Sequence, residues 1–241
     1  SGILIIGLFD FVEALAPPAD ADTLAYHFAL PKYFIDIGRL EFVPRALDGA
    51  IPLLVQMTYI PPLALGGERA LTLWTMTTGW LAGALIYVTC LRYLSWQWSL
   101  AVSILFLSTP AVVYGAGSGQ VEIRNSLFVL VAALSVAESV RTGNFKFAIL
   151  AGLASGFFVG GKYTGLIFAF SAGLTLLVQR RWLVSGISFS IALLVAGGQW
   201  YAWNFVHSGD PIFPMLYGVL EYFNDSYWDA AHHATLQSVW A

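Results

Sequence analysis

Three long stretches of this chain contain no aspartate, glutamate, lysine or arginine, and they limit its fold more than any other feature. They cover residues 70–91, 93–121 and 182–209. A helix needs about 20 predominantly apolar residues to cross the hydrocarbon core of a bilayer. Each stretch is long enough for that, so the chain is expected to cross a membrane as helices.

Composition supports a membrane protein and excludes other classes. Of the 241 residues, 58% are hydrophobic and only 10% are charged, and the net charge is −3. Soluble domains contain about 25% charged residues, so an ordinary soluble enzyme or a disordered chain is excluded. The small net charge and the lack of a basic run indicate no nucleic-acid partner. The single cysteine, Cys90, cannot form an internal disulfide.

The apolar segments predict an all-α polytopic membrane protein, a single transmembrane domain over residues 1–241. About seven transmembrane helices are expected, over residues 1–16, 70–91, 98–115, 124–140, 147–160, 163–178 and 183–203. If these spans alternate, the basic residues of three short loops lie on one side, which the positive-inside rule makes cytoplasmic. They are Arg92, Arg141, Lys146, Arg180 and Arg181. Residues 17–69 and the tail 204–241 are then expected at the outer face.

Residues 22–66 do not have the pattern of a plain loop. Asp22 precedes a short apolar segment, as a helix N-cap would. A second segment runs from Pro31 to Gly38, and glycine commonly ends helices. Prolines interrupt the apolar stretch that follows, and they leave pieces too short to span: Pro44, Pro52, Pro61 and Pro62. These features predict short helices that lie on the membrane surface rather than a transmembrane hairpin.

Polar residues from four separate parts of the sequence are expected at the outer face. Ionisable residues at a membrane edge are costly and are therefore candidates for a functional site. Each has a structural alternative: Asp22 can be a helix cap, Lys162 can extend to the interface, and His207 with Asp210 can belong to a turn. Glu122 and Arg124, at the start of the fourth span, can be solvated end residues of that helix. The candidates are Asp20, Asp22, Glu122, Arg124, Lys162, Asn204, His207 and Asp210.

Five segments share features with one known family. The first, PPADADTLAYHFALPKYFIDIGRL, has an acidic residue after the first span, then a Tyr-His stretch and a Pro-Lys helix. The others, in order, are AIPLLVQMTYIPPLALGGERAL, SGQVEIRNSLFVLVAAL, LAGLASGFFVGGKYTGL and QWYAWNFVHSGDPIFP. Together these segments resemble the C-type glycosyltransferase superfamily, in its bacterial dolichyl-phosphate-mannose mannosyltransferase-like branch.

The resemblance implies transfer of a sugar from a polyprenyl-phosphate carrier at the outer face of a bacterial inner membrane. By position, Asp22 matches the loop carboxylate, with Asp20 as its neighbour. Glu122 matches the second acidic residue, and Lys162 matches the basic one. A carboxylate near the acceptor can act as a general base. Lys162, together with Arg124, can stabilise the charge on the departing phosphate.

The resemblance also implies two further roles, substrate binding and metal binding. His207 is a candidate for substrate binding. Some family members hold a divalent metal between such acidic residues, where oxygen ligands suit Mg²⁺ or Mn²⁺. The carboxylates here fit a metal but do not require one.

Departures from the family leave other functions open. Trp203 stands where the family usually has an arginine beside Asn204, and Asp210 replaces the usual asparagine. Family members also continue through further spans, so a shortened copy or a fragment is expected. The main alternative is a non-catalytic subunit packed against other chains of a membrane complex. A small-solute transporter is a weaker alternative, because it predicts inverted repeats that the sequence lacks.

The expected topology is testable by labelling single cysteines. With Cys90 replaced, one cysteine in residues 17–69 and another in residues 204–241 should both react with an impermeant maleimide added outside intact cells. The reason is that all three basic loops would lie on the opposite, cytoplasmic side. Labelling of the two positions from opposite sides would refute the alternation of spans.

Overall fold

The computed structural model describes residues 2–43, 51–216, 219–220, 230–231, 234–235 and 238. The regular elements in these ranges are all helical, with no strand, which agrees with the predicted all-α class. They divide into two compact units, Ser1–Gly38 with Val55–Leu130 and Arg39–Leu54 with Val131–Ala241. Two parts of the chain lie outside the described residues. They are residues 44–50, in the expected first outer loop, and most of the expected tail beyond residue 216.

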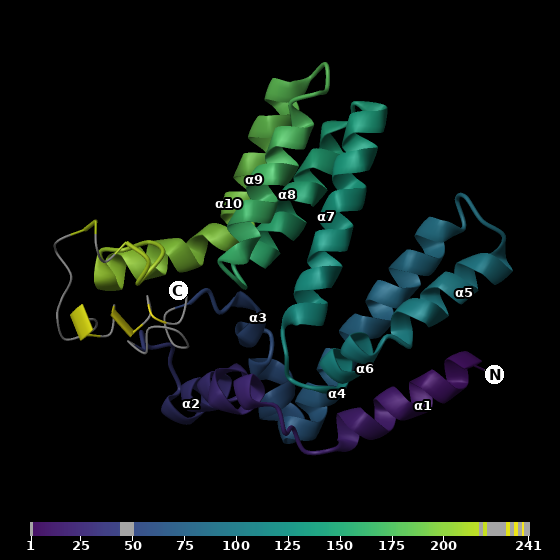
Figure 1. Ribbon diagram of the computed structural model, residues 1–241. Coiled ribbons are helices and arrows are strands. Elements are labelled where there is room, and N and C mark those ends of the chain that lie inside the picture. The colour runs from purple at the N-terminus through teal and green to yellow at the C-terminus, as the bar shows by residue number, and fades with distance from the viewer. Residues whose placement is uncertain are drawn as a thin grey trace. The chain divides into compact units, whose positions relative to one another are not determined.

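The first unit is built from the helices of the N-terminal half. α1 packs on α4 and α6, and α4 also packs on α5 (Figure 1). Hydroxyl groups bond across these contacts: Thr75 Oγ1 donates to the Ser118 carbonyl (2.8 Å), and Ser103 Oγ donates to the Gly83 carbonyl (2.8 Å). The elements are α1 (Gly2–Leu15), the π-helix η1 (Thr23–His27), α2 (Ala29–Ile37), α3 (Leu54–Met57), α4 (Ile60–Cys90), α5 (Trp96–Leu107), α6 (Pro110–Gly117) and the first part of α7 (Glu122–Thr142).

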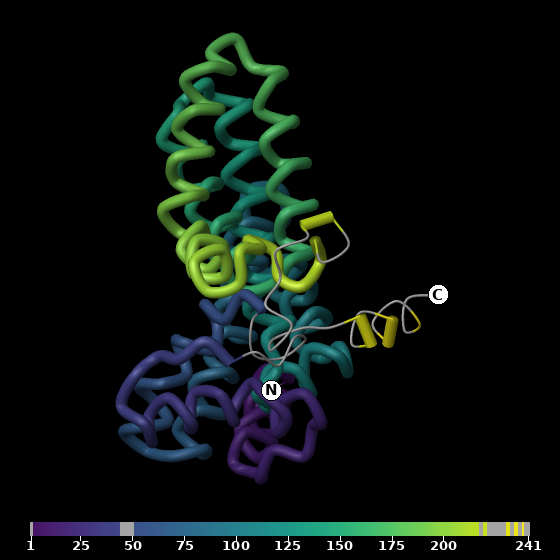
Figure 2. The backbone as a smooth tube through the Cα atoms, turned by 90° about the vertical axis from the view of Figure 1, so that its left-hand side faces the viewer, coloured from purple at the N-terminus to yellow at the C-terminus, as the bar shows by residue number. Residues whose placement is uncertain are grey.

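The second unit contains the rest of α7 with α8 (Phe145–Val159), α9 (Thr164–Leu176) and α10 (Trp182–Ser208). Glycines allow the backbones of α8 and α10 to touch. A Cβ at Gly152 would lie 2.3 Å from the Phe189 carbonyl oxygen, and one at Gly197 would lie 2.1 Å from that of Gly156. Small residues spaced four apart are typical of such close helix pairs in membranes. The C-terminal part of α10 turns away from α8 and α9 (Figures 1 and 2).

Three of the described helices, α4, α7 and α10, are long and apolar enough to cross a membrane. α5 and α6 together make a fourth candidate, bent by 66°. The bend follows from Pro110, which starts α6 and has no N–H to continue the ladder of α5. Three or four spans are therefore supported, where about seven were expected. α1, α8 and α9 have 14, 15 and 13 residues, fewer than the roughly 17–25 that a span needs.

Residues 17–69, the expected first outer loop, contain short helices over the residues described there. α2 ends at Gly38, whose φ of 69° lies in the left-handed region that glycine adopts without strain. The apolar stretch is interrupted next to Pro61 and Pro62: α3 ends at Met57, and the two prolines lie in the first turn of α4, where a proline needs no N–H. A second interruption follows at Gly66 and Gly67, where Gly67 has a φ of 67° and a non-helical ψ of −161°.

Filling the contact between α8 and α10 should destabilise the second unit. In Gly197→Leu the new side chain would overlap the backbone at Gly156, so the two helices must separate. Overpacking of this kind costs about 1–3 kcal/mol. We expect a clearly lower Tm in detergent, measured by circular dichroism.

The matched control is Gly186→Leu on the same helix, since a Cβ at Gly186 meets no atom within 4 Å. This variant should have a Tm equal to or above that of the parent, because leucine has a higher helix propensity than glycine. Equal losses in both variants would contradict the close contact.

Candidate functional site

Asp20 lies between α1 and η1 and accepts hydrogen bonds from several groups. Thr23 N–H and Thr23 Oγ1 both donate to its Oδ2 atom at 2.8 Å. Gln120 Nε2 donates to Oδ1 at 2.9 Å, and the Tyr114 hydroxyl donates to the same atom at 3.4 Å. Partial burial favours the protonated form, but these hydrogen bonds outweigh it and hold the pKa of Asp20 below its usual value.

Asp22 does not form the helix cap that the sequence predicted. An N-cap residue normally has extended dihedrals, which turn its side chain back toward the helix. Asp22 instead has helical dihedrals, φ −68° and ψ −37°, and its side chain makes no capping bond. Asp20 takes the capping role by accepting the Thr23 N–H. Asp22 is left exposed, with no hydrogen bond to any residue that the structure describes.

The connection between α6 and α7, residues 118–121, joins Asp20 to the rest of the unit. The buried Tyr59 hydroxyl donates to the carbonyls of Gly119 (3.1 Å) and Gln120 (3.3 Å). A Cβ at Gly119 would lie 2.1 Å from the ring of Phe28, so this approach requires glycine. Burial, partly offset by the positive charge of Arg124, raises the pKa of Tyr59 to about 12. Tyr59 is therefore a donor at any physiological pH.

Arg124 is a cation with only 6% of its surface exposed, near the start of α7. Its Nη1 atom donates to Thr58 Oγ1 at 2.6 Å, while Nε and Nη2 donate to Thr78 Oγ1 at 3.2 and 3.0 Å. The guanidinium carbon lies 5.1 Å from the ring centre of Tyr59 and 5.5 Å from that of Trp74. These are cation–π distances. No described carboxylate forms an ion pair with it.

A buried guanidinium without a carboxylate partner has a physical consequence. Removing a charge from water costs several kcal/mol unless an opposite charge or good hydrogen bonds compensate. The two threonine hydroxyls and the two aromatic rings around Arg124 compensate in part, and no carboxylate among the described residues neutralises its charge. Such a site favours a bound anion. Glu122, two residues before Arg124, is exposed.

In the second unit, Lys162 and His207 are both exposed. Lys162 lies in the turn between α8 and α9. His207, near the end of α10, has its Nδ1 atom 2.8 Å from the Trp203 carbonyl oxygen. Its ring stacks on Phe42, with centroids 5.2 Å apart and planes 8° from parallel. The His207 ring therefore packs against Phe42 and Trp203 of the same unit.

Asp210 and Asn204 support the turn that follows α10. The Asp210 carboxylate is fully buried and accepts the N–H groups of Ile212 (2.8 Å) and Leu216 (3.1 Å). Burial raises the pKa of Asp210, and these two bonds lower it by less. Asn204 Nδ2 donates to the Tyr163 hydroxyl at 3.0 Å, and that hydroxyl donates to the Phe213 carbonyl at 2.8 Å. This agrees with the structural alternative, an ordinary turn.

Sequence reasoning missed three residues that organise the site in the first unit, Tyr59, Tyr114 and Gln120. One signal for Gln120 was available, its position directly after the glycine-rich segment 115–119 and before Glu122. The tyrosines carried no signal, because tyrosine is common at membrane interfaces whatever its role.

Replacing Asp20 should destabilise the first unit. Asp20→Ala removes the cap on η1 and the acceptor for Gln120, and loss of a cap alone costs about 0.5–2 kcal/mol. Asp22→Ala removes an exposed carboxylate with no hydrogen bond to a described residue, and we expect a change within about 0.5 kcal/mol. Thermal unfolding of both variants in detergent measures the difference.

The pH dependence gives an independent check on Asp20. Because its pKa is lowered in the folded protein, its contribution is complete above the unfolded value of about 3.9 and is lost as the pH falls through the folded value. The stability gap between the parent and Asp20→Ala should therefore narrow in acid. A gap that stays constant down to about pH 2 would show that the carboxylate charge does not matter.

The predicted convergence of Asp22, Glu122 and Lys162 involves both units and stays a prediction, since the first two lie in one unit and Lys162 in the other. In the part of the chain that the structure describes, no three or more His, Cys, Asp or Glu side chains are grouped so that they could hold a metal ion. No protein-family model, curated protein or solved structure matches the chain.

Proposed function

We propose that the protein is a glycosyltransferase-like membrane protein that takes a sugar from a polyprenyl-phosphate carrier at the outer face of the membrane. One observation carries the proposal. In the first unit, a hydrogen-bonded carboxylate and a buried cation are both attached to residues 118–121. Asp20 accepts a hydrogen bond from the Gln120 side chain. The Arg124 guanidinium lies over the ring of Tyr59, and the Tyr59 hydroxyl donates to the Gln120 carbonyl. Sugar transfer from a lipid phosphate needs groups of both kinds.

In this proposal Asp22 is the general base and Asp20 positions it. Asp20 is occupied by its four hydrogen-bond donors, whereas Asp22, two residues away, is exposed and accepts none from the described residues. An acceptor hydroxyl would attack the anomeric carbon and pass its proton to Asp22. The bond between that carbon and the phosphate oxygen breaks, and polyprenyl phosphate leaves with the electron pair.

The departing phosphate gains negative charge, which Arg124 is suited to balance. A guanidinium has five N–H groups. Three of these donate to Thr58 and Thr78, one each from Nε, Nη1 and Nη2. One N–H therefore remains on Nη1 and one on Nη2, and these two can bind an anion. Lys162 in the second unit is the proposed second cation. Glu122 is the proposed second carboxylate, and His207 a further substrate contact.

A non-catalytic membrane subunit is the second candidate, and one observation favours it. Asp20 and Arg124 make internal hydrogen bonds that would also serve a purely structural polar cluster. Fully bonded polar clusters inside proteins often specify a unique packing rather than a reaction. In that case the same fold would hold other subunits of a complex and would turn over no donor.

The two candidates give different results in a turnover assay. Purified protein is incubated with polyprenyl-phosphate hexoses carrying a radioactive sugar, with cell-envelope extract as the acceptor source. Release of the free carrier is then measured. The proposal predicts release by the parent, loss of turnover in Asp22→Asn and only partial loss in Asp20→Asn, since the amide can still accept hydrogen bonds but not a proton.

The matched control is Asp36→Asn, an exposed carboxylate on α2 of the same loop, which should retain full activity. No carrier release by the parent from any hexose donor would favour the structural subunit. Release that survives Asp22→Asn in a folded protein would show that Asp22 is not the base.

A further inference from the structure

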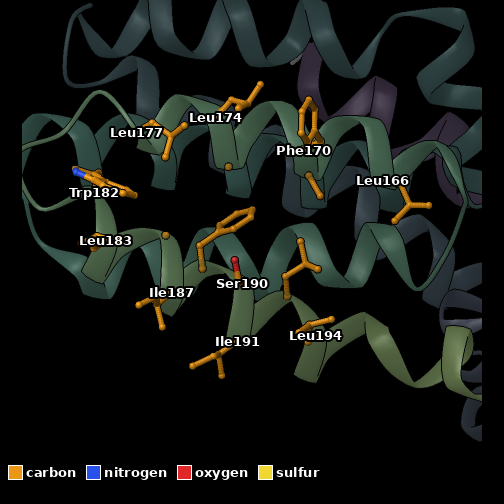
Figure 3. A pocket seen from close by; sticks show the side chains of 15 residues that line it. Leu166, Phe170, Leu174, Leu177, Trp182, Leu183, Ile187, Ser190, Ile191 and Leu194 are labelled. Carbon is orange, nitrogen blue, oxygen red and sulfur yellow. The ribbon is translucent and has the colours of Figure 1, made fainter.

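α9 and α10 border an apolar groove in the second unit. Its volume is ≈ 630 Å³, within the range of about 300–1,000 Å³ that is typical of ligand pockets. Figure 3 shows apolar side chains along both walls, with the Ser190 hydroxyl as the labelled oxygen among them. The wall residues that the argument uses are Leu166, Phe170 and Leu174 on α9, Leu177 directly after α9, and Leu183 and Ile187 on α10.

Two glycines keep the groove open. Gly173 on α9 and Gly186 on α10 line it without side chains. A Cβ at Gly186 would meet no atom within 4 Å, and one at Gly173 would only reach ordinary contact with Phe189, 3.6 Å away. Neither glycine is required by close packing, unlike Gly152 and Gly197 between α8 and α10. The space they leave lies beside a helix that is long and apolar enough to cross a membrane.

The length of the groove matches one leaflet of a bilayer. The first wall runs from Leu166 on α9 to Leu177 just after it, eleven residues apart, which is about 17 Å at 1.5 Å per residue. Half of a hydrocarbon core of about 30 Å is about 15 Å. A single acyl chain of a leaflet lipid therefore spans the groove from one end to the other.

Two positive charges lie at one end of the groove. Arg180 and Arg181 belong to the turn between Leu177 and Trp182, which line that end (Figure 3). Both arginines are exposed, and neither forms an ion pair with a described carboxylate.

The turn that carries these arginines is held in place from inside the unit. The buried Gln179 side chain bonds to Ser139 of α7 (Nε2 to Oγ, 3.3 Å) and accepts a bond from Ser185 of α10 (3.2 Å). These bonds fix the turn from which the two arginine side chains extend. Arginine forks suit phosphate oxygens.

We propose that this groove binds an anionic phospholipid, with one acyl chain between α9 and α10 and the phosphate at Arg180 and Arg181. The charges favour this occupant over a helix of a partner subunit, because an apolar helix gives two arginines nothing to bind. Basic residues beside membrane helices commonly recognise anionic head groups. The site is independent of the proposed sugar transfer, since it uses none of the residues assigned to that reaction.

Native mass spectrometry of the full chain in detergent tests the proposal. Phosphatidylglycerol and phosphatidylcholine with identical acyl chains are titrated separately, and bound lipid is counted. One phosphatidylglycerol should bind in preference to phosphatidylcholine. Each basic residue near an anionic lipid contributes about fivefold in affinity, so the double variant R180Q/R181Q should weaken phosphatidylglycerol binding roughly thirtyfold. Phosphatidylcholine binding should not change.

Filling the groove separates the acyl-chain contact from the charge contact. Gly186→Leu leaves both arginines in place and should abolish binding of either lipid, and Ser190→Trp, at a second residue that lines the groove, should do the same. Lys146→Gln, a basic residue of the same unit outside the groove, should bind lipid like the parent.

Three results would overturn the proposal. The first is equal binding of the two lipids by the parent, or unchanged phosphatidylglycerol binding in R180Q/R181Q. The second is displacement of phosphatidylglycerol by polyprenyl phosphate at equimolar concentration, which would make this the donor site. The third is formation of a protein–protein adduct, rather than a lipid adduct, when a photoreactive side chain replaces Ile187.

Discussion

Backbone hydrogen bonding is the constraint from which this architecture follows. In an apolar environment an unpaired N–H or C=O costs about 1–3 kcal/mol, so each long apolar segment satisfies its own groups as a helix. Small hydroxyl residues then bond to carbonyls at the contacts between helices, as Thr75 does at Ser118 and Ser103 at Gly83. Where a proline or glycine interrupts the ladder, as at Pro110 and Gly67, the helix bends or breaks. The spans therefore differ from the apolar segments.

The same constraint explains why the polar residues of the first unit form a network. Tyr59 and Arg124 are buried, Asp20 and Gln120 are partly buried, and each bonds to another residue of the unit. Residues 118–121 connect them, because their carbonyls and the Gln120 amide supply both donors and acceptors. The segment thus links a hydrogen-bonded carboxylate, through Gln120, to a buried cation that lies over the ring of Tyr59. It also gives the unit a specific packing.

The second unit uses glycine in two opposite ways. Gly152 and Gly197 allow α8 and α10 to touch at the backbone, where any side chain would force them apart. Gly173 and Gly186 face open space and leave a groove along α9 and α10. The turn at the end of the groove, which Gln179 holds in place, carries two arginines beside an otherwise apolar surface. Close packing and a lipid-sized space thus arise from the same residue type in different surroundings.

The sequence by itself determined the all-helical class, the order of the apolar segments and the stop of α2 at Gly38, because these depend on composition and on neighbours within one or two helical turns. Only the tertiary structure decided the three or four spans and the bonds that Tyr114 and Gln120 donate to Asp20. It also supplied the partners of Arg124. Thr78 and Thr58 lie 46 and 66 residues from Arg124, and Gln120 lies 100 from Asp20. Contacts at such separations form only when helices pack, and no local pattern records them.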